Sequence, residues 1–236
     1  MITQSILEKC LPFICTESRP VISPPPVMTT RRHRLAITIS RQTGSGAHSV
    51  GEKLAEYLQA RDRNASPQWR VFDRNLVETV LDEHNLPRRF ARYMPEDRVS
   101  EATDAVDELL GGHPSAWSLV QQTGETLLHL AKQGNVILIG RGANIITRNL
   151  DHMFHVRLVG SLERRIRHIQ QTHGLGESAA LEFIRREDRG RKRYLRKYFG
   201  EDPDDLSLYQ MVINTDFVTY QEAARIISDA AINSSR

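Results

Sequence analysis

A glycine-rich turn, Gly44-Ser45-Gly46, follows a short apolar run that ends at Ile39 and precedes an amphipathic stretch that begins at Ser49. Backbone N–H groups in a turn between a strand and a helix converge on one point, where the start of the helix adds a partial positive charge. Glycine lets the backbone come close to phosphate oxygens. The pattern therefore predicts a phosphate-binding turn, and a tight strand–helix turn without a ligand is the alternative.

A second group of residues is strongly basic: eight of the thirteen residues in 185–197 are Arg or Lys and two are acidic. On a helix, Arg185, Asp188 and Arg191 recur every three residues and share a face, so we expect Asp188 to hold both arginines in register. Arg189 lies beside them. These arginines suit a cation cluster that closes over phosphates. A solvated charged helix and a nucleic-acid contact surface are the alternatives, and the second is disfavoured because few aromatic residues interleave the run.

Two further polar residues come directly after predicted strands. Asp73 follows the second strand and Arg141 the third, so both should project from strand carboxyl ends near the glycine turn. Arginine suits forked contacts with phosphate oxygens. Asp73 can accept a hydrogen bond from a sugar hydroxyl, a base or a water on Mg²⁺. The alternatives are a surface salt bridge for Asp73 and a structural ion pair for Arg141.

Alternating strands and helices must position these residues. Short apolar runs predict strands at 35–39, 69–72, 135–139, 154–159 and 209–213. Helices are predicted at 49–59, 75–83, 161–172, 177–198 and 219–231, with a long polar and helical stretch at 96–133. Short apolar strands separated by helices indicate an α/β fold with a five-stranded parallel sheet and helices on both faces. In such folds ligands lie at the carboxyl ends of the strands.

Composition limits the classes of protein that fit. The chain has 236 residues, enough for one ordinary domain, and a formal net charge of +3, too weak by itself to indicate a nucleic-acid binder. No apolar run is long enough to cross a membrane. The two cysteines, Cys10 and Cys15, form no disulfide framework, which favours a cytoplasmic location. The nine histidines show no metal-ligand spacing, so we expect no metal site built by the protein.

The first 33 residues differ from the rest. They contain three consecutive prolines, Pro24–Pro26, which favour an extended linker. We expect a leader and linker over 1–33, either a poorly ordered tail or a docking helix, and a folded domain over 34–236.

The stretch 37–55 resembles the phosphate loop of P-loop nucleoside-monophosphate kinases, and most closely that of the cytidylate-kinase-like family. Further matches follow in the family's order at 71–74, 139–143, 154–157, 188–191 and 212–215. The order of the motifs, over roughly residues 35–232, is more specific than any one of them. The resemblance implies a three-layer P-loop kinase-like fold, with a helical acceptor-binding insertion at 88–130 and a lid at 176–200, where Gly190 would allow a bend.

The phosphate loop departs from the full pattern G-x-x-x-x-G-K-[ST]. In that register the chain has Arg41, Gly46, Ala47 and His48, so the phosphate-binding lysine is absent and Ser49 comes one residue late. Family members often carry arginine at the position of His48. Loss of one preorganised donor typically costs about 10²–10³ in rate. Arg41, beside the loop, is the expected substitute.

The resemblance also implies roles for these residues. Mg-ATP would bind at Gly44, Ser45, Gly46, Ala47, His48 and Ser49, with Asn214–Asp216 facing its base. A nucleoside monophosphate such as CMP or dCMP would lie between Asp73, Arg141 and the insertion, where Trp117 either packs or stacks on the base. Catalysis would use Arg41, Arg185, Asp188, Arg189 and Arg191. Cytidylate kinases carry Asp where this chain has Gly142, so the acceptor's identity is open.

We therefore expect a phosphotransferase that moves the γ-phosphoryl group of ATP to a nucleoside monophosphate. The alternative is a nucleotide-binding sensor or regulatory protein of the same fold with little catalysis, which the missing lysine and the leader favour. A third, weaker alternative is an RNA-associated protein that uses the basic helix. The oligomeric state, homodimer included, is open.

Overall fold

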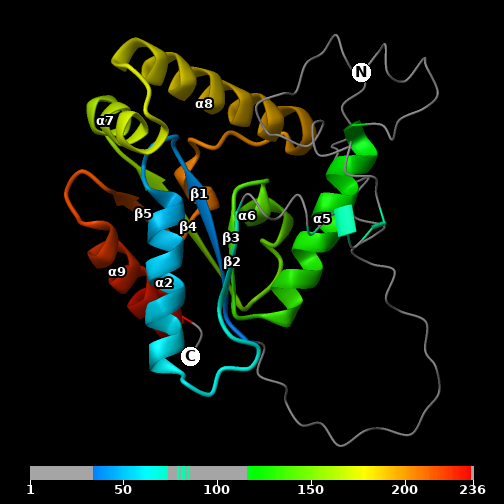
Figure 1. Ribbon diagram of the computed structural model, residues 1–236. Helices are drawn as coiled ribbons and strands as arrows, with labels where there is room; N and C mark the ends of the chain where they lie inside the picture. Colours follow the sequence, from blue (N-terminus) through cyan, green and yellow to red (C-terminus); the bar gives the residue numbers. More distant parts are fainter. Residues whose placement is uncertain (1–33, 74–78, 80, 83, 86–115, 235–236) are drawn as a thin grey trace, which may run out of the picture.

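A computed structural model of the chain describes residues 34–73, 79, 81–82, 84–85 and 116–234 (Figure 1). The leader over 1–33, most of the predicted helix over 75–83 and the larger part of the insertion over 88–130 lie outside these residues.

The core of the fold is a five-stranded sheet in which every strand pair is parallel. Its strands are β1 (Ala36–Arg41), β2 (Arg70–Phe72), β3 (Val136–Ile139), β4 (Met153–Val159) and β5 (Met211–Asn214). Their order across the sheet is β2-β3-β1-β4-β5, so β1 is central and β3 and β4 flank it. The parallel α/β sheet predicted from the sequence is confirmed.

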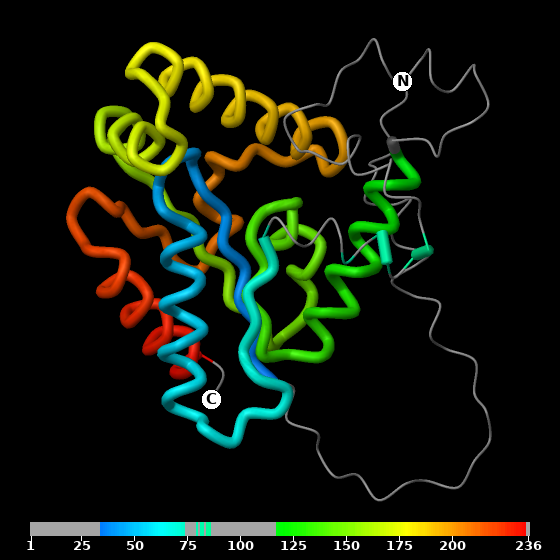
Figure 2. Tube along the Cα trace, viewed as in Figure 1, coloured from blue at the N-terminus to red at the C-terminus, as the bar shows by residue number. Residues whose placement is uncertain are grey.

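Helices cover both faces of this sheet, as Figures 1 and 2 show. They are α2 (Ala47–Arg61) and α9 (Tyr220–Ser234) on one face, and α5 (Ala116–Gln133) and α6 (Ala143–Ile146) on the other. Side chains alternate along a strand, so Ile37 and Ile39 pack under α2 and α9, whereas Ala36 packs toward α5. Burial on both faces explains why the inner strands β1, β3 and β4 read as continuous apolar runs.

Two more helices lie across the carboxyl ends of the strands (Figure 1). They are α7 (Leu162–His173) and α8 (Glu177–Phe199). Ser161 caps α7, accepting a hydrogen bond from the Arg164 amide at 3.4 Å. A short 3-10 helix, η3 (Leu206–Leu208), precedes β5.

Helix α8 is one unbroken helix over the whole basic run. Gly190, where the sequence predicts a bend, is buried inside this helix, which continues through it without a break. Tyr194, Leu195 and Tyr198 form a small apolar cluster with Ile145 of α6. The C-terminal half of α8 is thereby packed onto the end of the sheet that carries the predicted site.

Candidate active site

The turn between β1 and α2 has the backbone that its glycines predict. Gly44 and Gly46 have φ of +84° and +83°, a region that side chains strain. A Cβ at Gly44 would lie 2.7 Å from the Arg165 carbonyl oxygen, and one at Gly46 would lie 2.3 Å from the Tyr220 ring. Glycine is therefore required at both positions by conformation and by space.

The N-terminus of α2 opens toward the same turn. Within the part of the chain that the structure describes, no side chain caps this helix, and its first turn has no acidic residue. The first helical hydrogen bond is donated by Val50 to the Gly46 carbonyl at 2.9 Å, so the amides of Ala47, His48 and Ser49 come before it. Such amides, with the helix dipole, suit an anion.

Ser45 serves the turn itself. Its hydroxyl donates to the Gln42 carbonyl at 2.8 Å, and its amide donates to the same oxygen at 3.2 Å. The residue is 1% exposed. Among the predicted phosphate-turn residues, Ser45 thus faces inward, while Gly44, Gly46, Ala47, His48 and Ser49 line a cavity.

Asp188 of α8 joins the basic helix to the turn. Its Oδ1 accepts hydrogen bonds from the Thr43 amide at 2.8 Å and from the Thr43 hydroxyl at 2.7 Å. The same oxygen accepts from Arg191 Nη2 at 2.8 Å, and that nitrogen also contacts the Thr43 hydroxyl. The carboxylate therefore occupies the first amide of the turn.

The second arginine on Asp188 comes from α7. Arg165 Nη1 donates to Asp188 Oδ2 at 2.8 Å and to the Thr43 carbonyl at 3.2 Å, and its Nε donates to the Gly160 carbonyl at 3.1 Å. The expected pairing of Asp188 with Arg185 is wrong. Arg185 is exposed on α8, because the helix turns its Asp188 face toward Arg165 and the turn.

These contacts set the charge of Asp188. Burial alone would raise the pKa of its carboxyl. Two hydrogen bonds from Thr43 and the charges of Arg191 and Arg165 outweigh burial and hold the pKa below its usual value. Asp188 is therefore a carboxylate at neutral pH, and it neutralises cations that face the turn.

The cavity at the turn has a volume of about 510 Å³ and brings the two predicted acceptor residues beside the phosphate turn. Asp73, Arg141, Arg41 and Arg191 all line it. His48 Nδ1 lies 3.3 Å from Asp73 Oδ2, so Asp73 is held against the start of α2.

The segment after β3 has an unusual backbone. Gly140, Arg141 and Gly142 have φ of +82°, +57° and +68°. A non-glycine residue in this region costs about 1–3 kcal/mol, and such residues cluster at functional sites. A Cβ at Gly142 would lie 2.9 Å from the Phe199 ring, so α8 fills the space that a carboxylate side chain would need there.

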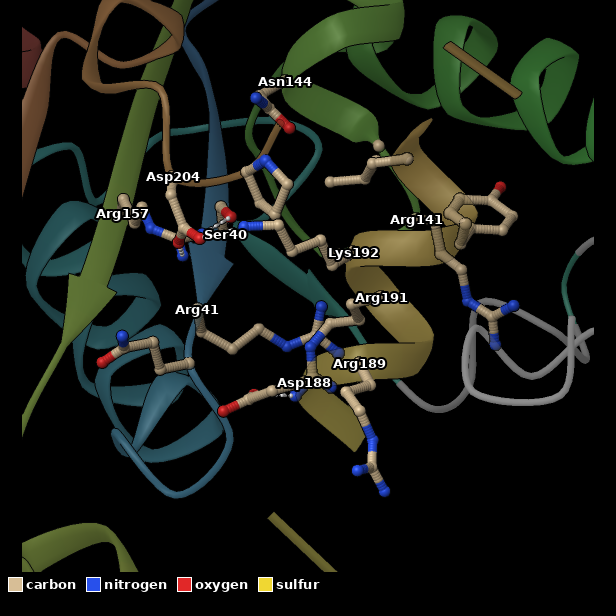
Figure 3. Close-up of a pocket in the computed structure, with 16 residues that line it drawn as sticks. Ser40, Arg41, Arg141, Asn144, Arg157, Asp188, Arg189, Arg191, Lys192 and Asp204 are labelled. Carbon is tan, nitrogen blue, oxygen red and sulfur yellow. Dashed lines mark hydrogen bonds and ion pairs between the residues drawn. The ribbon is translucent and has the colours of Figure 1, made fainter. Parts of the chain in front are cut away.

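A second cavity adjoins the first beneath α8 (Figure 3). Arg41, Arg141 and Arg191 line both cavities, and Arg189, exposed on α8, lines this second one. In Figure 3 the Arg41 side chain reaches from the end of β1 toward Arg191 of α8, whereas Arg141 lies on the other side of α8 in this view. Four of the five arginines predicted for the site therefore line one or both cavities, and the fifth, Arg185, lines neither.

A third cavity, of about 650 Å³, lies between α7 and the start of α9. Thr215, Asp216 and Tyr220 line it, with Gly44 at the side of the turn. Asp216 accepts a hydrogen bond from the Ser161 amide at 2.8 Å, which joins the end of β5 to α7. The residues expected to face the donor's base therefore border a hollow next to the glycine turn.

Trp117 lies away from all three cavities and stacks on Tyr198 with 6.3 Å between ring centroids.

Sequence reasoning missed Arg165 and Arg157. Arg165 lies four residues before the buried Ile169, so an arginine on the inward stripe of α7 was the available signal. Arg157 interrupts the apolar strand β4 and is 4% exposed. A charged residue inside a buried strand is rarely present without a partner or a ligand.

The described residues contain no cluster of three or more His, Cys, Asp and Glu side chains that could hold a metal ion. None of the helices described here has the length and hydropathy that a membrane span requires.

A parallel sheet of order β2-β3-β1-β4-β5, with a glycine turn between its central strand and the next helix, defines a P-loop kinase-like α/β protein. The family model of the cytidylate kinase-like family matches residues 36–217, which is more than half of the chain. The chain belongs to this family, as its motifs predict.

Relatives named cytidylate kinase cover most of the chain at low identity. One from Pyrococcus horikoshii is 26% identical over 78% of this chain and 81% of its own. One from Thermoplasma acidophilum is 27% identical over 86% of this chain and 95% of its own. A crystal structure of an uncharacterized protein from Eubacterium ventriosum has a TM-score of 0.62 and 21% identity, covering 85% of this chain and 99% of that one, and it supports the fold.

Proposed function

We propose that the protein is a phosphotransferase of the nucleoside-monophosphate kinase type, which moves the γ-phosphoryl group of ATP to a nucleoside monophosphate such as CMP or dCMP. One observation carries the proposal: a turn of left-handed glycines, an open helix N-terminus and the guanidinium groups of Arg41, Arg141 and Arg191 face one cavity. Phosphoryl transfer needs this combination, because its catalysis is mainly positioning and charge neutralisation.

The side chains at the turn fit a triphosphate with Mg²⁺. The amides at 46–49 and the arginines are donors for phosphate oxygens, and Asp73 and Ser49 bring oxygen ligands to the same cavity. Mg²⁺ in such sites is held by one or two carboxylates and the phosphates themselves, without an all-protein cage. Asp73 would hold the ion or its water, and the ion would supply charge neutralisation on the phosphates. Arg41 and Arg191 line the same cavity and take the place of the missing lysine.

Helix α8 acts as the cover of this site in the proposed mechanism. It reaches the turn through Asp188 and brings Arg191 to the phosphate position. Closure of such a cover excludes water from the transferring phosphoryl group. In the proposed mechanism, residues 34–236 form one catalytic domain. Residues 176–200 are its lid, and residues 88–130 complete the acceptor side.

We propose the class of acceptor, a nucleoside monophosphate, and not one particular base. Cytidylate kinases carry a carboxylate where this chain has Gly142, and α8 lies against that position. Phe199 and Leu195 of α8 lie 2.9 and 3.3 Å from the position of a Cβ at Gly142. Any recognition of a base must therefore use other groups around Arg141.

A nucleotide-binding sensor with little catalysis is the second candidate. The observation that favours it is the Asp188 carboxylate on the Thr43 amide, 2.8 Å away, because a phosphate at this amide must displace it. Such a protein would bind nucleotides and transfer phosphate slowly.

One experiment separates the two candidates. ADP release is measured with ATP, Mg²⁺ and a panel of nucleoside monophosphates, and the binding of each nucleotide is measured by calorimetry. Turnover with one acceptor supports the kinase and identifies its substrate, whereas binding without turnover supports the sensor. Absence of nucleotide binding up to millimolar concentration contradicts both.

A further inference from the structure

Tyr220, the first residue of α9, packs its ring directly on the glycine turn. A Cβ built on Gly46 would lie 2.3 Å from the Cε1 and Cζ atoms of this ring and 2.7 Å from its hydroxyl oxygen. The ring therefore fills the space beside the α-carbon of Gly46. The two residues lie far apart in the sequence, so no local pattern predicts this contact.

The ring reaches Gly46 from the cavity between α7 and the start of α9. Tyr220 lines that cavity, whereas Gly46 lines the cavity at the turn, where the phosphates would bind. Tyr220 can therefore act on a bound phosphate through the backbone of the turn. Such a residue positions the groups that bind phosphate and is not itself a catalytic residue.

The contacts around Tyr220 hold its ring in place. Its hydroxyl oxygen lies 3.2 Å from His168 Nδ1, and the two rings meet edge to face with 5.7 Å between their centroids. Thr219 begins α9 in a capping box: its amide and its hydroxyl donate to Glu222 Oε2, each at 2.8 Å, and its hydroxyl accepts from the Glu222 amide at 3.2 Å. Tyr220 also packs against the apolar core under α2 and α9. The ring is therefore fixed before a ligand binds.

This ring brings no charge to the turn. Burial raises the pKa of the Tyr220 hydroxyl. Burial also lowers the pKa of the His168 imidazole, and the nearby His173 lowers it further. At pH 7 a neutral phenol therefore faces a mainly neutral imidazole, and an anion at the turn meets no phenolate.

Gly46 is the residue of the turn whose conformation directs the amides. Its φ is +83°, and glycine adopts positive and negative φ about equally well, so its own chemistry does not choose this form. Its carbonyl accepts the first hydrogen bond of α2, from the Val50 amide at 2.9 Å. The conformation of Gly46 therefore sets where α2 begins and where the amides of 47–49 point.

We propose that Tyr220 is a positioning residue of the phosphotransfer site: its ring holds Gly46 in the left-handed form that directs the amides of 47–49 at the phosphates of the donor. The inference rests on the proposed function for its ligand, ATP, and adds to that site a residue from the start of α9. Donors that are ordered before the ligand arrives cost nothing to rearrange when it binds.

The test compares two ligands by calorimetry of the full chain, Mg-ATP and Mg-tripolyphosphate, of which the second has no base and no ribose. Tyr220→Ala should weaken the binding of both by the same factor, about tenfold, which is the cost of ordering one backbone residue on binding. A loss confined to ATP means that Tyr220 contacts the nucleoside, and it overturns the proposal. Unchanged binding of both ligands overturns it as well.

Three further variants make the result specific. Tyr220→Phe keeps the ring on Gly46 and loses only the contact with His168, so it should keep most of the affinity that Tyr220→Ala loses. Tyr220→Leu keeps an apolar side chain against the core but is too short to reach the turn, and it repeats the test should the Ala variant fail to fold. Tyr57→Ala makes the same truncation at a half-buried tyrosine in the second half of α2, packed on the same core, and should leave both affinities unchanged. An equal loss in Tyr57→Ala overturns the proposal.

Hydrogen exchange of the nucleotide-free protein separates this inference from the proposed function. The Val50 amide, bonded to the Gly46 carbonyl, should exchange at least about tenfold faster in Tyr220→Ala than in the wild type, and unchanged exchange overturns the proposal. Faster exchange in a protein whose wild type binds no ATP means that the kinase function fails while the hold of Tyr220 on the turn stands. ATP binding that Tyr220→Ala leaves intact means the reverse.

Discussion

Replacing Asp188 by asparagine removes one negative charge from the point where α8 meets the glycine turn, with almost no change in side-chain shape. Arg165 loses its carboxylate partner at 2.8 Å, and Arg191 loses the nearer of two, at 2.8 Å, while Glu187 stays 3.9 Å away. The Arg165 side chain is only 11% exposed, so water cannot fully replace the lost partner. The variant therefore tests whether Asp188 holds the basic helix on the turn.

The expected loss of stability follows from these contacts. Removing one partner of a buried ion pair costs about 3–5 kcal/mol. The Asp188 side chain is 31% exposed, and Arg165 keeps its bonds to the Thr43 and Gly160 carbonyls. We expect a loss of about 2 kcal/mol in the free energy of unfolding, which lowers the melting temperature of a chain of this size by about 4–8 °C.

The measurement is thermal unfolding at pH 7, followed by circular dichroism. Glu182→Gln is the matched control, since it makes the same charge change at an exposed position of α8. Because the pKa of Asp188 is lowered in the folded state, its contribution is complete above the ordinary carboxyl pKa and is lost as the pH falls below about 4. A variant that melts with the wild type, or a control that costs as much, refutes the reasoning.

Three other substitutions test separate parts of the structure. Arg41→Ala should lower the rate of ADP release by about 10²–10³ without changing the melting temperature, and undiminished turnover removes Arg41 from the mechanism. Gly46→Ala should abolish ATP binding in calorimetry, since its Cβ would lie 2.3 Å from the Tyr220 ring. Gly124→Ala is the control and should bind ATP normally, since among the described residues its Cβ would meet only Ile146, at 4.0 Å. ATP binding by Gly46→Ala would contradict the phosphate turn. Burial lowers the pKa of His155 to about 4, so between pH 6.5 and pH 4 the unfolded chain takes up a proton that the folded chain does not. Urea unfolding should show that the wild type loses about 3 kcal/mol more than His155→Asn on going from pH 7 to pH 4, and equal losses would show that His155 is not buried as a neutral side chain.

The strands and the glycine turn were predictable because local sequence determines them. The inner strands β1, β3 and β4 are buried on both faces and read as apolar runs. The predicted ends differ from those of Ala36–Arg41 and Met211–Asn214 by one or two residues. The short helix α6 (Ala143–Ile146) was missed because four residues are too few to show a helical period.

The partners of Asp188 show where sequence reasoning ends. Arg191 was predicted because it lies three residues away on the same helix, where spacing alone brings side chains together. Arg165 lies 23 residues away on another helix, and only the packing of α7 against the turn brings it to Asp188. Local spacing offered Arg185 in its place, because periodicity shows which residues share a face but not which face meets the turn.

The position of Asp188 has a consequence for any ligand that binds at the turn. Arginines buried beside a phosphate site are costly when no anion faces them. In this chain a carboxylate on α8 fills that place, bound to the Thr43 amide and to both guanidinium groups. If the turn binds a triphosphate as proposed, a phosphate oxygen exchanges for the Asp188 carboxylate, and Arg165 and Arg191 face an anion before and after the exchange. The cations can thus remain folded against the turn without a ligand, and the cost of binding becomes the displacement of one carboxylate.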